Sequence, residues 1–126
     1  MFLTKRVVRL SETDATGAIY FTNILKYATE TFEEFLGASI FEENYLLPIV
    51  SAKATFLKPL FMGNEVVLQL ISSKMGTTSI KLQTEIYSGD VLVCKVEVIH
   101  VATSRSEGKK IPIPPLLREY LSCLEL

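Results

Sequence analysis

The sequence NILKYATETFEEFL, residues 23–36, has the periodicity of a helix that is covered on more than one side. Its apolar and small residues recur at helical spacing: Ile24, Leu25, Tyr27, Ala28, Thr31, Phe32, Phe35 and Leu36. Thr22 or Asn23 can cap the start of this helix, and Gly37 stands where a helix normally ends. A helix of this size is about 21 Å long. Its apolar arc is wider than one surface stripe, so we expect another element to wrap around it.

Hydrophobic alternation with a period of two follows this helix and continues through most of the remaining chain. Strands are predicted at residues 5–10, 50–57, 65–73, 78–87 and 91–103. Gly63-Asn64 and Ser88-Gly89-Asp90 are typical of turns between strands. A short helix is predicted at residues 116–124, after a proline-rich segment.

The order of these elements indicates the fold class. A single long helix cannot supply the strand–helix alternation of a parallel sheet, so an antiparallel arrangement is favoured. We predict an α+β protein in which a meandering, curved antiparallel sheet wraps around one long central helix. Residues 1–126 are predicted to form a single domain. Such a sheet leaves one face and one edge exposed, and we therefore expect a homodimer or homotetramer.

Composition excludes several functions. Hydrophobic residues make up 48% of the chain and charged residues 21%, which is sufficient for a packed core. A net charge of −1 gives no long-range field for nucleic acid or an anionic membrane surface. No apolar run is long enough for a membrane span, and residues 1–6 do not resemble a signal peptide, so a cytoplasmic location is expected. Cys94 and Cys123 are predicted to be small buried residues, and no metal or cofactor is expected.

The segment TDATGAIYFTN, residues 13–23, carries the chemistry. Asp14 lies in a loop seven residues before Phe21, which stands at the predicted helix entrance, and Gly17 permits a tight reversal between them. The first-turn N–H groups of a helix are unpaired, and the helix dipole makes that end positive. A thioester oxygen placed there is polarised, while Asp14 attacks the carbonyl carbon or deprotonates a water molecule that does. An isolated Asp before a Gly is otherwise usually a turn residue.

The pattern Asp-x-x-Gly-x-Ile-Tyr-Phe-x-Asn resembles the signature of the 4-hydroxybenzoyl-CoA thioesterase family of hotdog proteins. The similarity continues through residues 30–36, 47–50 and 56–64, and covers most of the chain up to about residue 102. The resemblance implies a hotdog fold and acyl-CoA thioesterase activity. By position, Asp14 matches the catalytic aspartate of the family, and Phe21 matches the residue whose backbone N–H polarises the thioester. Asn64 stands where relatives usually carry Asp, a difference that we expect to be structural.

The resemblance also bears on the substrate. Many members of the family have His at the position of Phe21; Phe is found in the aromatic-acyl branch that includes 1,4-dihydroxy-2-naphthoyl-CoA hydrolases. An aromatic acyl-CoA is therefore expected, with Tyr20 and Tyr27 as core residues or walls of the substrate groove. Thr77 and Thr78 fall near the position where relatives contact the acyl group from a neighbouring subunit. Threonines are equally common as ordinary residues at the start of a strand, with no role in substrate binding.

Other functions stay open at this stage. A hotdog hydratase generally pairs a His with a carboxylate at the helix entrance, whereas His100 follows alternating apolar residues and is predicted to be buried in a strand. A non-catalytic module that binds acyl-CoA or acyl-carrier protein has the same fold, and so does a thioesterase for aliphatic acyl groups. Arg105, Lys109 and Lys110 form a basic cluster that either holds CoA phosphates or is a solvated surface.

Overall fold

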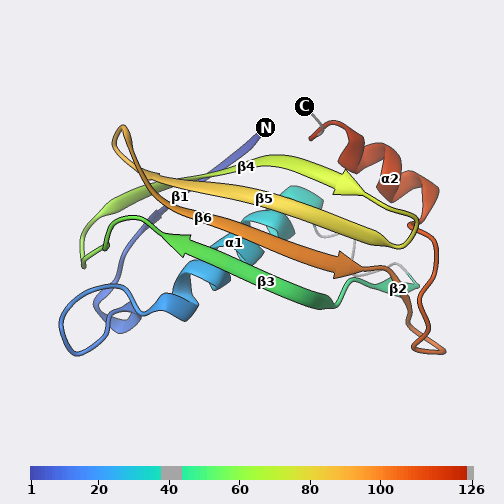
Figure 1. Cartoon of the computed structure of the whole chain (residues 1–126), viewed down its shortest axis with the longest axis horizontal. Coiled ribbons are helices and arrows are strands. Elements are labelled where there is room, and N and C mark those ends of the chain that lie inside the picture. Colours follow the sequence, from blue (N-terminus) through green and yellow to red (C-terminus); the bar gives the residue numbers. More distant parts are fainter. Residues whose placement is uncertain (38–43, 125–126) are drawn as a thin grey trace.

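The computed structural model describes residues 1–37 and 44–124 and shows one curved sheet holding a long helix (Figure 1). Helix α1, Phe21–Leu36, crosses the concave face of a five-stranded antiparallel sheet. The strands are β1 (Phe2–Val7), β3 (Ile49–Phe56), β4 (Glu65–Met75), β5 (Ser79–Ser88) and β6 (Val91–Val101). The shorter elements are η1 (Leu10–Glu12), β2 (Tyr45–Leu46), β7 (Thr103–Ser104) and α2 (Pro115–Ser122).

The sheet order is β1-β4-β5-β6-β3, which corrects part of the predicted meander. Strands β4, β5 and β6 do follow one another as neighbours. Strand β3, however, pairs with β6 instead of the next strand in sequence, and β1 closes the opposite edge beside β4. The connection across residues 57–64 spans the end of the sheet, which places β3 at an edge. The central strands of the sheet are therefore β4, β5 and β6, with β1 and β3 at its edges.

Burial follows the predicted periodicities. The buried residues of α1 are Ile24, Tyr27, Ala28, Thr31, Phe32 and Phe35. On β5, Ile80, Leu82, Thr84 and Ile86 are buried, as the alternation of this strand predicts. Three register shifts interrupt the ladders, at Ile49/Ser51, Leu70/Ser72 and Ile86/Tyr87. Such bulges increase the local bend of a sheet, which allows a curved surface to enclose much of the helix.

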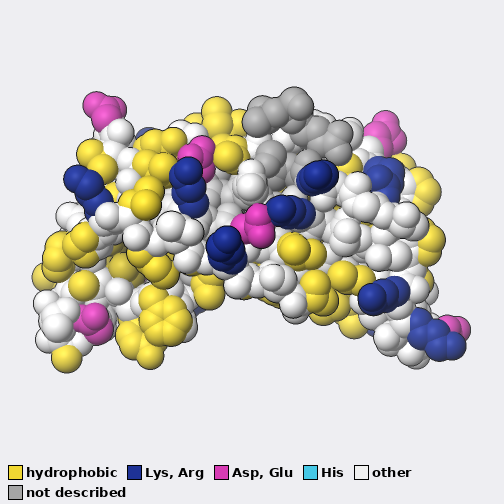
Figure 2. Space-filling model, viewed as in Figure 1, with side chains coloured by type: hydrophobic (Ala, Val, Ile, Leu, Met, Phe, Trp, Pro, Cys, Tyr) yellow, Lys and Arg dark blue, Asp and Glu magenta, His cyan; other side chains and the backbone are white. Residues whose placement is uncertain are grey.

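The opposite face of the sheet is polar and open. Lys81, Lys95 and Glu97 project from it, and Lys81 Nζ lies 3.1 Å from Glu97 Oε1. Figure 2 shows Lys and Arg side chains across the middle of this face. Hydrophobic side chains gather instead at the end of the molecule where α1 begins and β3 ends.

Helix α2 covers the C-terminal half of α1. Leu117 and Leu121 of α2 pack in the same core cluster as Phe32 and Phe35. The Tyr120 hydroxyl donates a hydrogen bond of 2.6 Å to the Phe35 carbonyl, and the two rings stack with centroids 4.7 Å apart. With this end of α1 closed, the end that begins at Phe21 is the accessible one.

Several predicted details are corrected. The first strand begins and ends three residues earlier than the predicted range 5–10, and the central helix begins two residues earlier than expected. Cys94 is buried as predicted, but Cys123 is exposed because it lies after the last turn of α2; both are free thiols. Neither helix in the described part of the chain is long and apolar enough to cross a membrane.

Candidate active site

The entrance of helix α1 lacks the side-chain cap that the sequence suggested. The N-cap residue is Tyr20, and its side chain makes no capping hydrogen bond. Neither Thr22 nor Asn23 caps the helix; both lie inside its first turn. The first turn carries no acidic residue, so the positive end of the helix dipole is not neutralised within it. The N–H of Phe21, at the first helical position, therefore faces a site suited to a partial negative charge.

Asp14 lies in a tight loop just before this entrance. Its Oδ1 accepts hydrogen bonds from the Thr16 N–H at 2.8 Å and from the Thr16 hydroxyl at 2.6 Å. Its own N–H donates to the Ala18 carbonyl at 2.7 Å, and Gly17 has φ 87°, a conformation that favours glycine. The carboxylate is exposed. The two bonds from Thr16 lower the pKa of Asp14 below its ordinary value of 3.8, so the carboxylate is ionised at neutral pH.

A second set of bonds ties this loop to α1. The Glu12 carbonyl accepts the Tyr20 N–H at 2.8 Å and the Asn23 side-chain amide at 3.0 Å. Glu12 Oε1 accepts the Tyr27 hydroxyl at 2.7 Å and the Arg9 N–H at 2.9 Å. Asn23 and Tyr27, in the first two turns of α1, thus hold the residue from which the loop begins.

An apolar groove of about 310 Å³ opens at the helix entrance. It is lined by Ala18, Ile19, Phe21, Ile24, Phe56, Leu57, Lys58, Pro59, Leu60, Val93 and Cys94. The Phe21 side chain is 55% exposed, which leaves an aromatic surface at the same point as the helix N–H groups. Burial raises the pKa of the Cys94 thiol to about 11, so Cys94 contributes an unreactive apolar wall.

The structure brings some predicted site residues together and separates others. Asp14, Gly17, Tyr20 and Phe21 belong to one loop and the helix that follows it. Asp14 is not among the residues that line the groove within one chain. Tyr27 is only 1% exposed and offers almost no surface to a substrate.

The two predicted threonines lie elsewhere. Thr77 and Thr78 precede β5 at the end of the sheet near α2, whereas α1 begins at the other end (Figure 1). One chain alone therefore does not bring them to Phe21.

His100 is buried, as the sequence predicted. It is 5% exposed, its Nδ1 donates a hydrogen bond of 2.8 Å to the Leu47 carbonyl, and its ring lies 4.9 Å from that of Phe32. Burial lowers the pKa of the imidazole, which keeps it neutral. His100 therefore packs against the middle of α1, away from the helix entrance.

Sequence reasoning missed Glu12 and Asn23. The one available signal was Tyr27: a tyrosine on the buried side of a helix needs an acceptor for its hydroxyl. Nothing local in the sequence indicated that this acceptor stands fifteen residues earlier.

Comparison with known proteins identifies thioesterases as relatives of this chain by sequence and by structure. The family model of the thioesterase-like superfamily matches residues 8–121. The chain is 32% identical to a 1,4-dihydroxy-2-naphthoyl-CoA hydrolase of Nostoc punctiforme, over 95% of this chain and 86% of that protein. Identity to the protein of the same name from Microcystis aeruginosa is also 32%, over 96% and 95% of the two chains. The crystal structure of a 1,4-dihydroxy-2-naphthoyl-CoA thioesterase from Synechocystis superposes with a TM-score of 0.87 at 25% identity, covering 98% of this chain and 96% of that one.

The contacts of Asp14 lead to a titration experiment. We predict that Thr16→Val raises the pKa of Asp14, because the hydroxyl bond that this change removes is the largest influence holding the pKa down. The measurement is a pH titration of the Asp14 carboxyl carbon by NMR. Thr13→Val is the matched control, because the Thr13 hydroxyl donates to the Leu10 carbonyl instead. An unchanged titration in Thr16→Val would contradict the assignment of these bonds.

The lowered pKa of Asp14 also determines how the stability of the fold changes with pH. The pKa of Asp14 is lower in the folded than in the unfolded chain, so its ionisation stabilises the fold above the unfolded value of 3.8. This contribution is lost as the pH falls through the lower, folded pKa.

Proposed function

The chain belongs to the thioesterase-like superfamily and is a thioester hydrolase of the hotdog fold, and from this premise we propose that it hydrolyses the CoA thioester of an aromatic acid. Its relatives named 1,4-dihydroxy-2-naphthoyl-CoA hydrolase make that compound the first candidate substrate. The exposed Phe21 ring beside an apolar groove supports an aromatic acyl group.

The helix entrance carries the proposed chemistry. The thioester oxygen accepts a hydrogen bond from the Phe21 N–H, where the helix dipole stabilises the negative charge that develops on it. One well-placed donor of this kind contributes about 3 kcal/mol to the transition state. The observation that supports this assignment is the absence of a side-chain cap on a helix whose preceding loop holds an ionised Asp14.

Asp14 acts in one of two ways. As a nucleophile, a carboxylate oxygen bonds to the carbonyl carbon, the C–S bond breaks, and CoA leaves as a thiolate. Water then hydrolyses the mixed anhydride, which releases the acid and restores Asp14. As a general base, Asp14 takes a proton from the water molecule that attacks. Single turnover in ¹⁸O-labelled water separates the two routes, because only the anhydride route puts the label into the Asp14 carboxylate.

Strand β3 supports the proposal that the site is completed in a homodimer or homotetramer. β3 pairs with β6 along one edge, and all but one of its residues are exposed. Ile49, Val50 and Phe56 of β3, and Leu57 just after it, are each 46% to 59% exposed. Phe56 and Leu57 also line the groove, at the end of β3 nearest the helix entrance. An apolar open edge of this kind pairs readily with a second copy of itself. We propose that the neighbouring chain then brings its Thr77 and Thr78 to the acyl group.

The first test of this function replaces the proposed catalytic group. We expect Asp14→Asn to lower kcat at least 100-fold, while the melting temperature stays within a few degrees, because the exposed side chain contributes charge but little packing. The matched control is Asp90→Asn, which changes the chain's other aspartate, in the β5–β6 turn. A fully active Asp14→Asn protein would refute the catalytic assignment.

The second test concerns the substrate. We expect kcat/KM for 1,4-dihydroxy-2-naphthoyl-CoA to exceed that for hexanoyl-CoA by at least about tenfold, because binding differences of a few kcal/mol separate acyl groups in apolar pockets. CoA release is followed with a thiol-reactive dye. Cys123 is exposed, so the assay uses a Cys123→Ser protein, which removes the background reaction. A preference for aliphatic or carrier-bound acyl groups would contradict the aromatic assignment. Tight binding without release of thiol would favour a non-catalytic module.

The third test concerns the oligomer. We expect the protein in solution to have at least twice the mass of one 14.1 kDa chain by light scattering. Val50→Glu places a charge on the open edge strand and is expected to give monomers with greatly reduced activity. Leu116→Glu is the matched control: this residue is also exposed and apolar, but it lies on α2. An active monomeric protein would rule out a site shared between chains.

A further inference from the structure

Glu12, the residue at which the Asp14 loop leaves η1, accepts four hydrogen bonds. Two go to its carboxylate, from the Tyr27 hydroxyl at 2.7 Å and the Arg9 N–H at 2.9 Å. Two go to its carbonyl, from the Tyr20 N–H at 2.8 Å and the Asn23 side chain at 3.0 Å. Glu12 ends η1 and lies two residues before Asp14.

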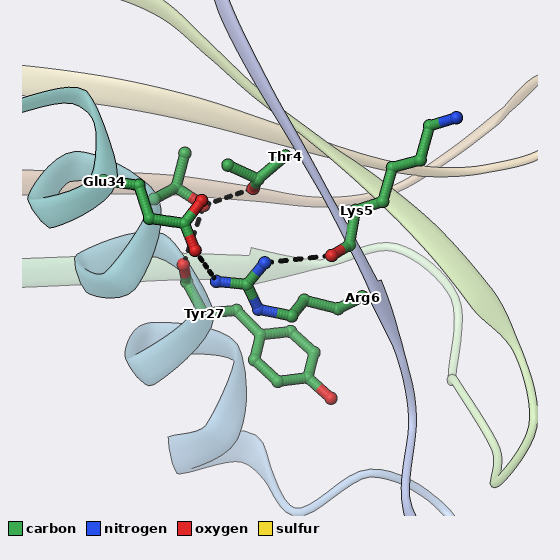
Figure 3. Close-up of polar contacts among 6 residues, drawn as sticks. Thr4, Lys5, Arg6, Tyr27 and Glu34 are labelled. Carbon is green, nitrogen blue, oxygen red and sulfur yellow. Dashed lines mark hydrogen bonds and ion pairs between the residues drawn. The ribbon is translucent and has the colours of Figure 1, made fainter.

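The helical side of this contact is rigid. Asn23 and Tyr27 are four residues apart, so they lie on one face of α1 in successive turns. The Tyr27 ring is 1% exposed and packs in the core with Val66 and Leu68 of β4. Figure 3 shows the ring directed away from the Thr4 and Arg6–Glu34 contacts higher on the helix. A ring that is packed on all sides holds its hydroxyl at a fixed position, so it can locate Glu12.

The Tyr27 hydroxyl also remains a donor under all ordinary conditions. Burial, the hydrogen bond to Glu12 and the negative charge of that residue all raise the pKa of Tyr27 far above its usual value of 10.0. The Tyr27 hydroxyl therefore stays protonated, and able to donate this bond, at neutral pH, where Asp14 is ionised.

The far end of the Asp14 loop has its own anchor. The Ile19 N–H donates to the Leu60 carbonyl at 2.6 Å, and Ala18 forms a bridge with Phe61. Between the anchors, residues 13–18 are held by short internal bonds, such as that from the Asp14 N–H to the Ala18 carbonyl at 2.7 Å. The loop is thus tied together internally, and Glu12 is the point that joins it to the helix.

We propose that the Tyr27–Glu12 hydrogen bond positions the Asp14 loop for catalysis. This inference rests on the proposed function of Asp14 and adds two positioning residues to it. Tyr27 and Glu12 do not touch the substrate; they set the distance between the Asp14 carboxylate and the helix entrance. Reaction rates are steep in this distance, since a displacement of about 1 Å can cost a hundredfold in rate. Tyr27, for which the sequence predicted either a core position or a wall of the substrate groove, lies in the core and acts through Glu12.

The test removes either end of the bond. Tyr27→Phe keeps the packed ring but loses the hydroxyl, and Glu12→Ala removes the acceptor. Both are expected to lower kcat by about 10-fold to 100-fold, while KM changes less than about threefold, because the groove itself is unaltered. Glu12→Gln retains an oxygen that accepts the Tyr27 hydroxyl and should recover most of the rate. A higher KM with unchanged kcat in Tyr27→Phe would overturn the proposal.

Thr31→Val is the matched control for a purely structural effect. Thr31 follows Tyr27 by one turn on the same helix, is 0% exposed, and shares a hydrogen bond of 2.7 Å with the Thr4 hydroxyl of β1. This change also removes the bonds of a buried hydroxyl on α1, to Thr4 and to the Tyr27 carbonyl at 2.9 Å, but neither bond involves the Tyr27 hydroxyl or the Asp14 loop. A lower melting temperature with unchanged kcat is expected. An equal loss of kcat in Thr31→Val and Tyr27→Phe would overturn the positioning role.

A combined variant separates this inference from the function on which it rests. Tyr27→Phe in an Asp14→Asn protein should cause no further loss of the residual single-turnover rate, because the group to be positioned is already absent. If the two losses simply multiply, Tyr27 acts independently of Asp14 and the positioning role is wrong. If Asp14→Asn is itself fully active, the catalytic assignment fails first. If only Asp14→Asn is inactive and Tyr27→Phe has normal activity, the further inference alone fails.

Discussion

Burial of helix α1 is the constraint on which the rest of this structure depends. Six of its sixteen residues are buried, and they cover too wide an arc for a flat surface to enclose. The sheet meets this requirement by curling, with bulges in its ladders and β1 and β3 at its two edges. The helix is thereby fixed along most of its length, and α2 closes its C-terminal end. What remains accessible is the end that begins at Phe21.

The chemistry of the site follows from that accessibility. A helix held by core packing does not need a side-chain cap to be stable, so the Phe21 N–H can serve the proposed ligand site. The same packing fixes Tyr27, and through Glu12 it fixes the loop that carries Asp14. Stability and the proposed reactivity therefore depend on the same helix. The buried face supplies the free energy of folding, and the exposed entrance supplies the positive end of a dipole.

The edges of the sheet explain why one chain holds only part of the proposed site. β3 lies at an edge because the strands that curl around the helix must end somewhere, and its apolar residues are left uncovered, with Phe56 at the groove. Thr77 and Thr78 lie at the far end of the same sheet. A second chain that pairs along β3 would supply what the first chain cannot reach, so an unpaired edge and an incomplete site have one cause.

The sequence by itself determined the features that depend on neighbouring residues. Helical spacing in residues 23–36 and alternation in β5 predict which side chains face the core, and the motif around Asp14 indicates the family, because these signals lie within a few residues of each other. Only the tertiary structure decided that β3 pairs with β6, that Tyr27 reaches Glu12 and that Thr77 lies far from Phe21. These contacts join residues distant in sequence. Whether they form depends on how the whole chain packs, and no local pattern records that outcome.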